Sequence, residues 1–297
     1  MPANFSIVPE IVRKENLINA TALQTSTFNL SSIVGPILAG SLIALFSIGE
    51  KSSFYSVGLV FFVITSLLFI ATFLTLFIKH HGKPENTTTT SSLEDFKEGF
   101  NFVWKEKTIL GLLLMGLLPS AFGKASNFLL PAFNQDVISG GPEELGILSA
   151  GMGVGALLGS LLLANLSNVK RKGKLMLGTA YGWALAILTF TLTGSLTMAI
   201  LFGAVAAFFG SIFGALNMSL IQLQAPQYIR GRVISLLIVM SGVMPLAVVP
   251  IGGVAEYLGV SVALAFAAMM VGLSVWILNA LFPKLKGISN ISETNAG

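Results

Sequence analysis

Residues 196–221 read LTMAILFGAVAAFFGSIFGALNMSLI and contain no charged side chain. At a rise of about 1.5 Å per residue, a helix of this length crosses the roughly 30 Å hydrocarbon core of a lipid bilayer. Gly210 and Gly214 are four residues apart and therefore share one helix face, where small side chains let a second helix approach closely. The stretch predicts a membrane-spanning helix that packs against a neighbour.

Eight apolar stretches of this kind run through the chain, and most exceed the roughly 18 residues that suggest a membrane span. They are residues 20–46, 54–78, 108–133, 145–166, 175–192, 196–221, 233–257 and 260–282. Hydrophobic residues make up 54% of the chain and charged residues 10%, whereas soluble domains are about one quarter charged. We therefore expect an all-α membrane protein with eight transmembrane helices rather than a water-soluble protein.

The basic residues indicate how the chain is oriented. All but two of the 17 Lys and Arg residues lie near the ends of the chain or in every second gap between the apolar stretches. The exceptions are Lys51, in an opposite gap, and Lys124, inside a stretch. The positive-inside rule then places both termini in the cytoplasm of a protein in the plasma (cytoplasmic) membrane. The net charge of +4 lies on this one face, beside the lipid bilayer, and is no argument for a nucleic-acid partner.

The order of apolar and polar segments predicts four parts. Residues 1–78 would form a partial N-terminal bundle of two helices, and residues 79–107 a cytoplasmic linker. Residues 108–282 would form a C-terminal bundle of six helices, followed by a cytoplasmic tail at 283–297.

The linker carries the pattern of an amphipathic helix. Ser91 and Glu94 have the spacing of a capping box. Apolar residues follow at helical intervals, at positions 93, 96, 100 and 103, and give a stripe that suits the headgroup region of a membrane. A plain connector between two bundles is the alternative interpretation.

A short internal similarity suggests a duplicated unit. The pentapeptide at residues 9–13, PEIVR, resembles PQYIR at residues 226–230, and each precedes an apolar stretch with glycine and proline. Four predicted spans separate residue 108 from the second pentapeptide, whereas none precedes the first. We therefore expect the first unit to lack four helices.

Three stretches carry a family resemblance. The first is residues 31–40, with Gly35, Pro36, Ala39 and Gly40 in the arrangement of an antiporter motif. The second is the glycine-rich stretch 144–159, and the third is Pro226 followed by Arg230, Gly231, Arg232 and Val233. Together they resemble the major facilitator superfamily, specifically its drug and siderophore exporters and macrolide efflux proteins.

The resemblance implies a partial major facilitator fold, in which the eight spans are helices five to twelve of a twelve-helix transporter. It also implies secondary active export of a small amphipathic compound, drug- or siderophore-like, by proton antiport, with no cofactor. The residues implied in conformational change are Gly35, Pro36, Gly40, Arg230, Gly231, Arg232, Pro245 and Pro250. A truncated, non-transporting membrane remnant of such an exporter is the alternative.

The physical chemistry of glycine and proline supports a moving helix bundle. Gly151, Gly155 and Gly159 recur every four residues, which predicts a second close helix contact. Pro245 and Pro250 each lack a backbone donor and should bend the span at 233–257. Bent helices suit two bundles that rock against each other during alternating access.

Candidate substrate-binding residues are the polar groups inside the spans. A lysine at the bilayer centre costs roughly 2.5 to 3.5 kcal/mol on insertion scales, so Lys124 should face a cavity or a partner, unless it snorkels to the outer surface. Asn127 lies about one helical turn away and should share that face. Asn29 and Asn217 are weaker candidates, because a buried amide more often bonds a neighbouring helix.

Signatures of an enzyme are lacking from the sequence. It contains no zinc-binding His-Glu-x-x-His, no phosphate-binding loop and no serine elbow. With no cysteine there is no thiol chemistry and no cysteine-ligated metal, and the two histidines, His80 and His81, sit in the polar linker. We therefore expect neither an enzyme nor a metal protein.

Overall fold

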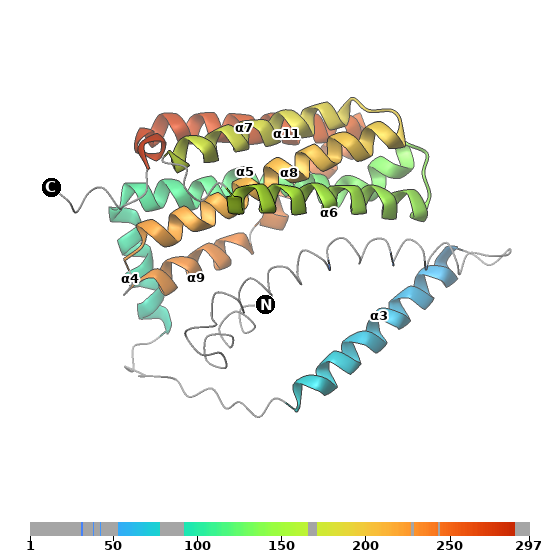
Figure 1. Cartoon of the computed structure of the whole chain (residues 1–297), viewed down its shortest axis with the longest axis horizontal. Helices are drawn as coiled ribbons and strands as arrows, with labels where there is room; N and C mark the ends of the chain where they lie inside the picture. Colours follow the sequence, from blue (N-terminus) through green and yellow to red (C-terminus); the bar gives the residue numbers. More distant parts are fainter. Residues whose placement is uncertain are drawn as a thin grey trace. The chain divides into compact units, whose positions relative to one another are not determined.

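The computed structural model describes residues 53–77, 92–165, 171–226, 229–242 and 244–288, together with Ser31, Leu38 and Leu42. Within these residues every regular element is a helix, which confirms the prediction of an all-α protein (Figure 1). The chain divides into two compact units. One contains Met1–Thr89 and Pro142–Ala150, and the other contains Thr90–Gly141 and Gly151–Gly297.

The described helices are numbered in chain order. The α-helices are α3 (Ser53–Thr75), α4 (Ser92–Lys105), α5 (Lys107–Asp136), α6 (Pro142–Asn165), α7 (Lys172–Thr191), α8 (Leu196–Gln224), α9 (Arg230–Ser241), α10 (Val248–Leu258) and α11 (Val260–Leu281). Two short 3-10 helices, η2 (Met244–Ala247) and η3 (Pro283–Gly287), complete the described elements.

Six stretches of the described residues are long and apolar enough to cross a membrane. They are Gly58–Thr75, Lys107–Asp136, Pro142–Leu163, Leu196–Gln224, Gly231–Leu258 and Val260–Leu281. The predicted span at 175–192 is helical, as α7, but is not among these six, because Lys172 and Lys174 in the first turn of α7 and several polar or small residues lower its mean hydropathy. Apart from Ser31, Leu38 and Leu42, which are helical, the predicted span at 20–46 lies outside the described residues.

The core of the second unit forms around α5. This helix contacts α11 and α8 along its length, and α7 packs against both α8 and α11. Because α5 is apolar nearly all round, it buries side chains on several faces, as expected of a helix in the interior of a bundle. Leu112, Met115, Ile187, Leu216 and Val271 are among the buried core residues.

The glycines of α6 make a close contact with α8, as predicted. A Cβ atom added at Gly155 would meet the backbone of Ala204, and one added at Gly159 would lie 2.5 Å from the Phe208 carbonyl oxygen. The Ser211 hydroxyl donates a hydrogen bond of 2.9 Å to the Ala156 carbonyl across the same contact. Packing of backbone against backbone therefore holds these two helices together.

Gly210 and Gly214, the two glycines that share a face of α8, differ in how closely they are packed. Gly210 does lie in a tight contact, because an added Cβ would be 3.0 Å from the Trp183 ring. An added Cβ at Gly214 would have no heavy atom within 4 Å. The prediction of close packing at Gly214 is therefore wrong, because no neighbouring helix approaches this position closely.

The predicted span at 233–257 is broken, and the prolines explain where. Since a proline ring clashes with the carbonyl four residues earlier, Pro245 is incompatible with α-helix at Ser241, where α9 ends. Pro250 likewise excludes an α-helical conformation at Leu246, four residues earlier, and Leu246 lies in the 3-10 helix η2. The predicted bend is therefore a break. Gly259, with φ of 91°, then allows the direct turn from α10 into α11.

The amphipathic linker helix is present as α4, which runs across the ends of α5 and α9 (Figure 1). Val103 is buried against the bundle, and an added Cβ at Gly99 would lie 3.2 Å from the Arg232 Cβ. The Glu98 carboxylate pairs with the Arg232 guanidinium. The linker helix is thus attached to the start of α9 by a close contact and an ion pair.

Candidate functional site

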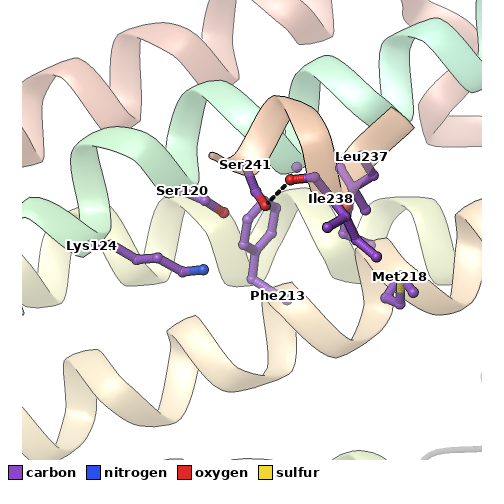
Figure 2. A pocket seen from close by; sticks show the side chains of 10 residues that line it. Ser120, Lys124, Phe213, Met218, Leu237, Ile238 and Ser241 are labelled. Carbon is purple, nitrogen blue, oxygen red and sulfur yellow. Dashed lines mark hydrogen bonds between the residues drawn. The ribbon is translucent and has the colours of Figure 1, made fainter. Parts of the chain in front are cut away.

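Helices α5, α8 and α9 surround a cavity of about 210 Å³ (Figure 2). Each helix contributes one wall. The lining residues are Gly116, Ser120 and Lys124 from α5, Phe213, Gly214, Asn217 and Met218 from α8, and Leu237, Ile238 and Ser241 from α9.

The α5 wall is built from three residues at intervals of four. Gly116, Ser120 and Lys124 therefore share one helix face. The first two are small, which leaves room in front of α5, and the third brings a long cationic side chain. In Figure 2 the Lys124 ammonium and the Ser120 hydroxyl lie on the side of α5 that faces the Phe213 ring.

Phe213 of α8 forms a rigid floor of the cavity. Phe213 is 1% exposed, and its ring lies 5.8 Å from the Trp183 ring of α7. Trp183 fits into a notch formed by Gly123 of α5 and Gly210 of α8, where any added Cβ would collide with or press on the indole. Interlocking of this kind fixes the ring that forms the floor of the cavity.

Asn217 joins two walls of the cavity. Its side chain is 4% exposed, and its amide nitrogen donates a hydrogen bond of 2.9 Å to the Leu112 carbonyl. Its amide oxygen faces Gly116, where an added Cβ would lie 2.5 Å away. The asparagine therefore holds α8 close to α5 while it lines the cavity.

The α9 wall is apolar except at its end. Leu237 and Ile238 face the cavity, and the Ser241 hydroxyl donates a hydrogen bond of 2.7 Å to the Ile238 carbonyl (Figure 2). This wall is a short helix that is separated from α10 by η2 and paired with α4 through Arg232. Helix α9 packs against α4, α5 and α8.

Lys124 is the only charged residue among those that line the cavity. Among the described residues no carboxylate forms an ion pair with its ammonium group. The cavity therefore offers one positive charge and two hydroxyl groups between apolar walls. Arrangements of this kind bind small amphipathic molecules, because a few polar groups orient a ligand that apolar walls enclose.

The structure brings together only some of the predicted binding residues. Lys124 and Asn217 both line the cavity, whereas Asn127 is exposed and does not. Asn29 lies outside the described residues.

The predicted motif residues lie in several places. Arg230 begins α9, and Gly231 beside it is exposed. Pro245 and Pro250 are exposed at the break between α9 and α10, and Arg232 binds Glu98. Gly35, Pro36 and Gly40 lie outside the described residues.

Sequence reasoning missed several residues of the cavity. Gly116 and Ser120 could have been found by stepping back from Lys124 in intervals of four, because these positions share its helix face. The apolar residues of α9 carry no such signal, since leucine and isoleucine are ordinary in any membrane helix.

Comparison with known proteins places the chain in a family. A family model described as transmembrane secretion effector, of the major facilitator type, matches residues 1–295. The enterobactin exporters EntS of Shigella boydii serotype 18, Shigella boydii serotype 4 and Escherichia coli O1:K1 are each 26% identical over 231 residues. That alignment covers 78% of this chain and 53% of each relative, so the chain spans about half the length of the curated relatives it matches.

Solved structures support the fold. A bacterial homologue of the human lysosomal transporter Spinster, in an inward-facing and unoccupied conformation, matches with a TM-score of 0.66 and 16% identity, over 96% of this chain and 75% of that chain. A POT family transporter in complex with 5-aminolevulinic acid matches with a TM-score of 0.58 and 13% identity, over 94% of this chain and 72% of that chain. The chain therefore belongs to the transmembrane secretion effector family of major facilitator transporters and is an integral membrane protein.

Proposed function

We propose that this chain acts in the export of a small amphipathic compound, drug- or siderophore-like, by secondary active transport. The observation that carries the proposal is the cavity between α5, α8 and α9, which puts one lysine and two hydroxyls between apolar walls. The names of the relatives, which are exporters, support the direction of transport.

The bundle offers a fixed part and a movable part for alternating access. The contact of α6 with α8 joins backbone to backbone through Gly155 and Gly159, so it cannot slide without separation. The α9 wall is a half-helix that ends at the proline-induced break. We expect α9 to move relative to α8 and so to open or close the cavity, with Arg230, Gly231, Arg232, Pro245 and Pro250 as the conformational residues.

Proton antiport is part of the proposal, and its support is the family resemblance. The acidic residues of the described spans lie near helix ends, at Asp136, Glu143, Glu144 and Glu256. The test is efflux from preloaded cells before and after a protonophore collapses the proton gradient. Efflux that continues unchanged would remove protons from the mechanism.

Filling the cavity tests the transport function. Gly214 lines the cavity, and an added side chain there meets no heavy atom within 4 Å of its Cβ, so Gly214→Leu should fill the site without disturbing the fold. The matched control is Gly178→Leu on α7, where an added Cβ also meets nothing but which is not among the lining residues. Accumulation of a fluorescent amphipathic dye would be measured in cells that lack their own efflux pumps.

We expect the unmodified chain and the Gly178→Leu variant to lower dye accumulation, and Gly214→Leu to restore it. If Gly214→Leu still lowers accumulation, the cavity is not the transport site. If the unmodified chain itself leaves accumulation unchanged, the alternative of a non-transporting membrane protein is favoured instead.

We also propose that both termini face the cytoplasm, because the basic residues gather on that side. The absence of cysteine from the sequence allows a clean labelling test. Asp136→Cys and Lys105→Cys place single thiols at the outer end of α5 and on α4. A membrane-impermeant maleimide should label the first in intact cells and the second only after permeabilisation, and the reverse pattern would invert the topology.

A further inference from the structure

We infer that the cavity between α5, α8 and α9 selects an anion, namely a ligand with one carboxylate or similar acidic group beside a single ring-sized apolar group. This inference rests on the proposed function, since it assigns a ligand class to the same site. It is carried by the charge, the free hydrogen-bond donors and the volume of the cavity.

The charge of the cavity is positive, and the described residues supply no counterion. Lys124 is the only charged lining residue, and no carboxylate of the described residues pairs with it. Lys124 is exposed on one side and lines the cavity on the other. A ligand in the cavity shields the ammonium group from water, and opposite charges attract each other more strongly there than in water. An anionic ligand supplies the missing counter-charge, whereas a cationic ligand meets a like charge.

The hydrogen-bond donors of the cavity point to the same conclusion. The Asn217 amide group donates to the Leu112 carbonyl and to the Met176 sulfur, and the Ser241 hydroxyl donates to the Ile238 carbonyl, so both groups are engaged within the protein. Ser120 is 8% exposed, lines the cavity and makes no hydrogen bond to the described residues. The Ser120 hydroxyl and the Lys124 ammonium therefore remain as donors, four residues apart on one helix face (Figure 2). A carboxylate, which only accepts hydrogen bonds, fits this pair.

The volume of the open cavity sets the size of the apolar group that its walls can cover. An apolar protein cavity of about 150 Å³ holds one benzene molecule, so the cavity of about 210 Å³ holds one six-membered ring with a small acidic substituent. Phe213, Met218, Leu237 and Ile238 supply the walls for the ring. The open space in front of Gly214 completes the room that the ring needs.

Three ligands of nearly equal shape but different charge distinguish the effect of charge on binding from the effect of size. The probes are para-fluorobenzoate, para-fluorobenzamide and para-fluorobenzylamine, whose binding to the full chain in lipid nanodiscs is followed by fluorine NMR. We expect the anionic benzoate to bind about tenfold or more tightly than the neutral amide, since hydrogen bonds to charged groups are stronger than those between neutral groups. The cationic amine should bind weakest.

Variants identify the residues that make this preference. Lys124→Met should remove the preference for benzoate over benzamide, and Lys124→Arg should retain it, because arginine keeps the positive charge. Ser120→Ala should weaken benzoate binding several-fold and leave benzylamine unchanged. Equal binding of benzoate and benzamide, tighter binding of benzylamine, or a preference that survives Lys124→Met would each overturn the inference, as would the absence of any benzoate binding.

The same variants keep the inference separate from the proposed function. If Gly214→Leu abolishes binding of all three probes but the unmodified chain shows no charge preference, the site stands and the anionic ligand class falls. If charge preference is observed but Gly214→Leu does not restore dye accumulation, the ligand class stands and the transport function falls. Gly178→Leu should match the unmodified chain in both measurements.

Discussion

Helix α8 has two glycine-lined sides, one closed and one open. Toward α6, the helix presents the backbone of Ala204 and Phe208 to Gly155 and Gly159, with no room for a side chain. Toward α5 and α9, Gly214 faces a cavity. The difference teaches that the spacing of glycines predicts a shared helix face, while the partner helix decides whether that face is a contact or a binding site.

The two sides should respond oppositely to added volume. At the closed side a new side chain meets backbone, which cannot turn away, so added volume costs stability. At the open side a new side chain enters empty space, so added volume costs ligand binding instead. The same glycine-to-leucine substitution on each side tests this expected difference.

The largest effect should come from Gly155→Leu. An added side chain collides with the Ala204 backbone, so α6 and α8 must separate. We expect destabilisation of about 3 kcal/mol or more, seen as a large fall in the melting temperature of the detergent-solubilised protein by tryptophan fluorescence.

Gly178→Leu is the control for Gly155→Leu, because an added Cβ at this exposed α7 position has open space around it. If Gly155→Leu melts at the temperature of Gly178→Leu, the closed contact between α6 and α8 does not exist as described.

The second effect, of about 1 to 2 kcal/mol, should come from Asn217→Ala. This change removes the hydrogen bond from the amide to the Leu112 carbonyl, which joins α8 to α5 beside the cavity. The melting temperature should fall less than in Gly155→Leu. An unchanged melting temperature would mean that Asn217 belongs to the cavity alone and not to the contact between the helices.

Much of the helical framework follows from the sequence. The predicted stretches 108–133, 196–221 and 260–282 became α5, α8 and α11 with ends that differ by a few residues. Apolar runs of this length, with at most one charged residue, satisfy their backbone hydrogen bonds in hydrocarbon as helices. The capping-box spacing at Ser91 and Glu94 likewise predicted a linker helix, observed as α4.

The cavity was harder to predict, because it depends on distances between helices. The small residues Gly116 and Ser120 on α5 indicate one helix face, but they do not indicate how far away the facing helix lies. Lys124 was singled out by its charge and lines the cavity, whereas Asn127 was chosen for the same face and does not line it, although both side chains are exposed. At about 100° per residue Asn127 lies only about 20° from Ser120 around the helix axis, so it shares that face, but it lies about 4.5 Å beyond Lys124 along the axis. It is therefore past the last α5 residue that lines the cavity.

A third, smaller effect should come from Glu98→Gln in α4, which removes the ion pair with Arg232 at the start of α9. The partly exposed ion pair of Glu98 and Arg232 attaches α9, which borders the open side of α8, to α4. At the closed side of α8, by contrast, backbone contacts hold the helices together. Exposed ion pairs contribute about 0 to 1 kcal/mol, so the melting temperature should fall slightly, and less at high salt. Glu256→Gln, which removes an exposed carboxylate of α10, is the control. A loss that is independent of salt would contradict a charge interaction.

The smallest effect on stability, and one of opposite sign, should come from Gly214→Leu. Leucine favours helix over glycine by up to about 1 kcal/mol, and the added side chain meets no neighbour at its Cβ. The melting temperature should therefore stay unchanged or rise slightly, measured in the same way as for Gly155→Leu. A marked fall would show that the helices close over this position and that no cavity exists there. Since the same variant should lose ligand binding, a glycine that weakens its own helix is retained at a cost in stability where function requires the space.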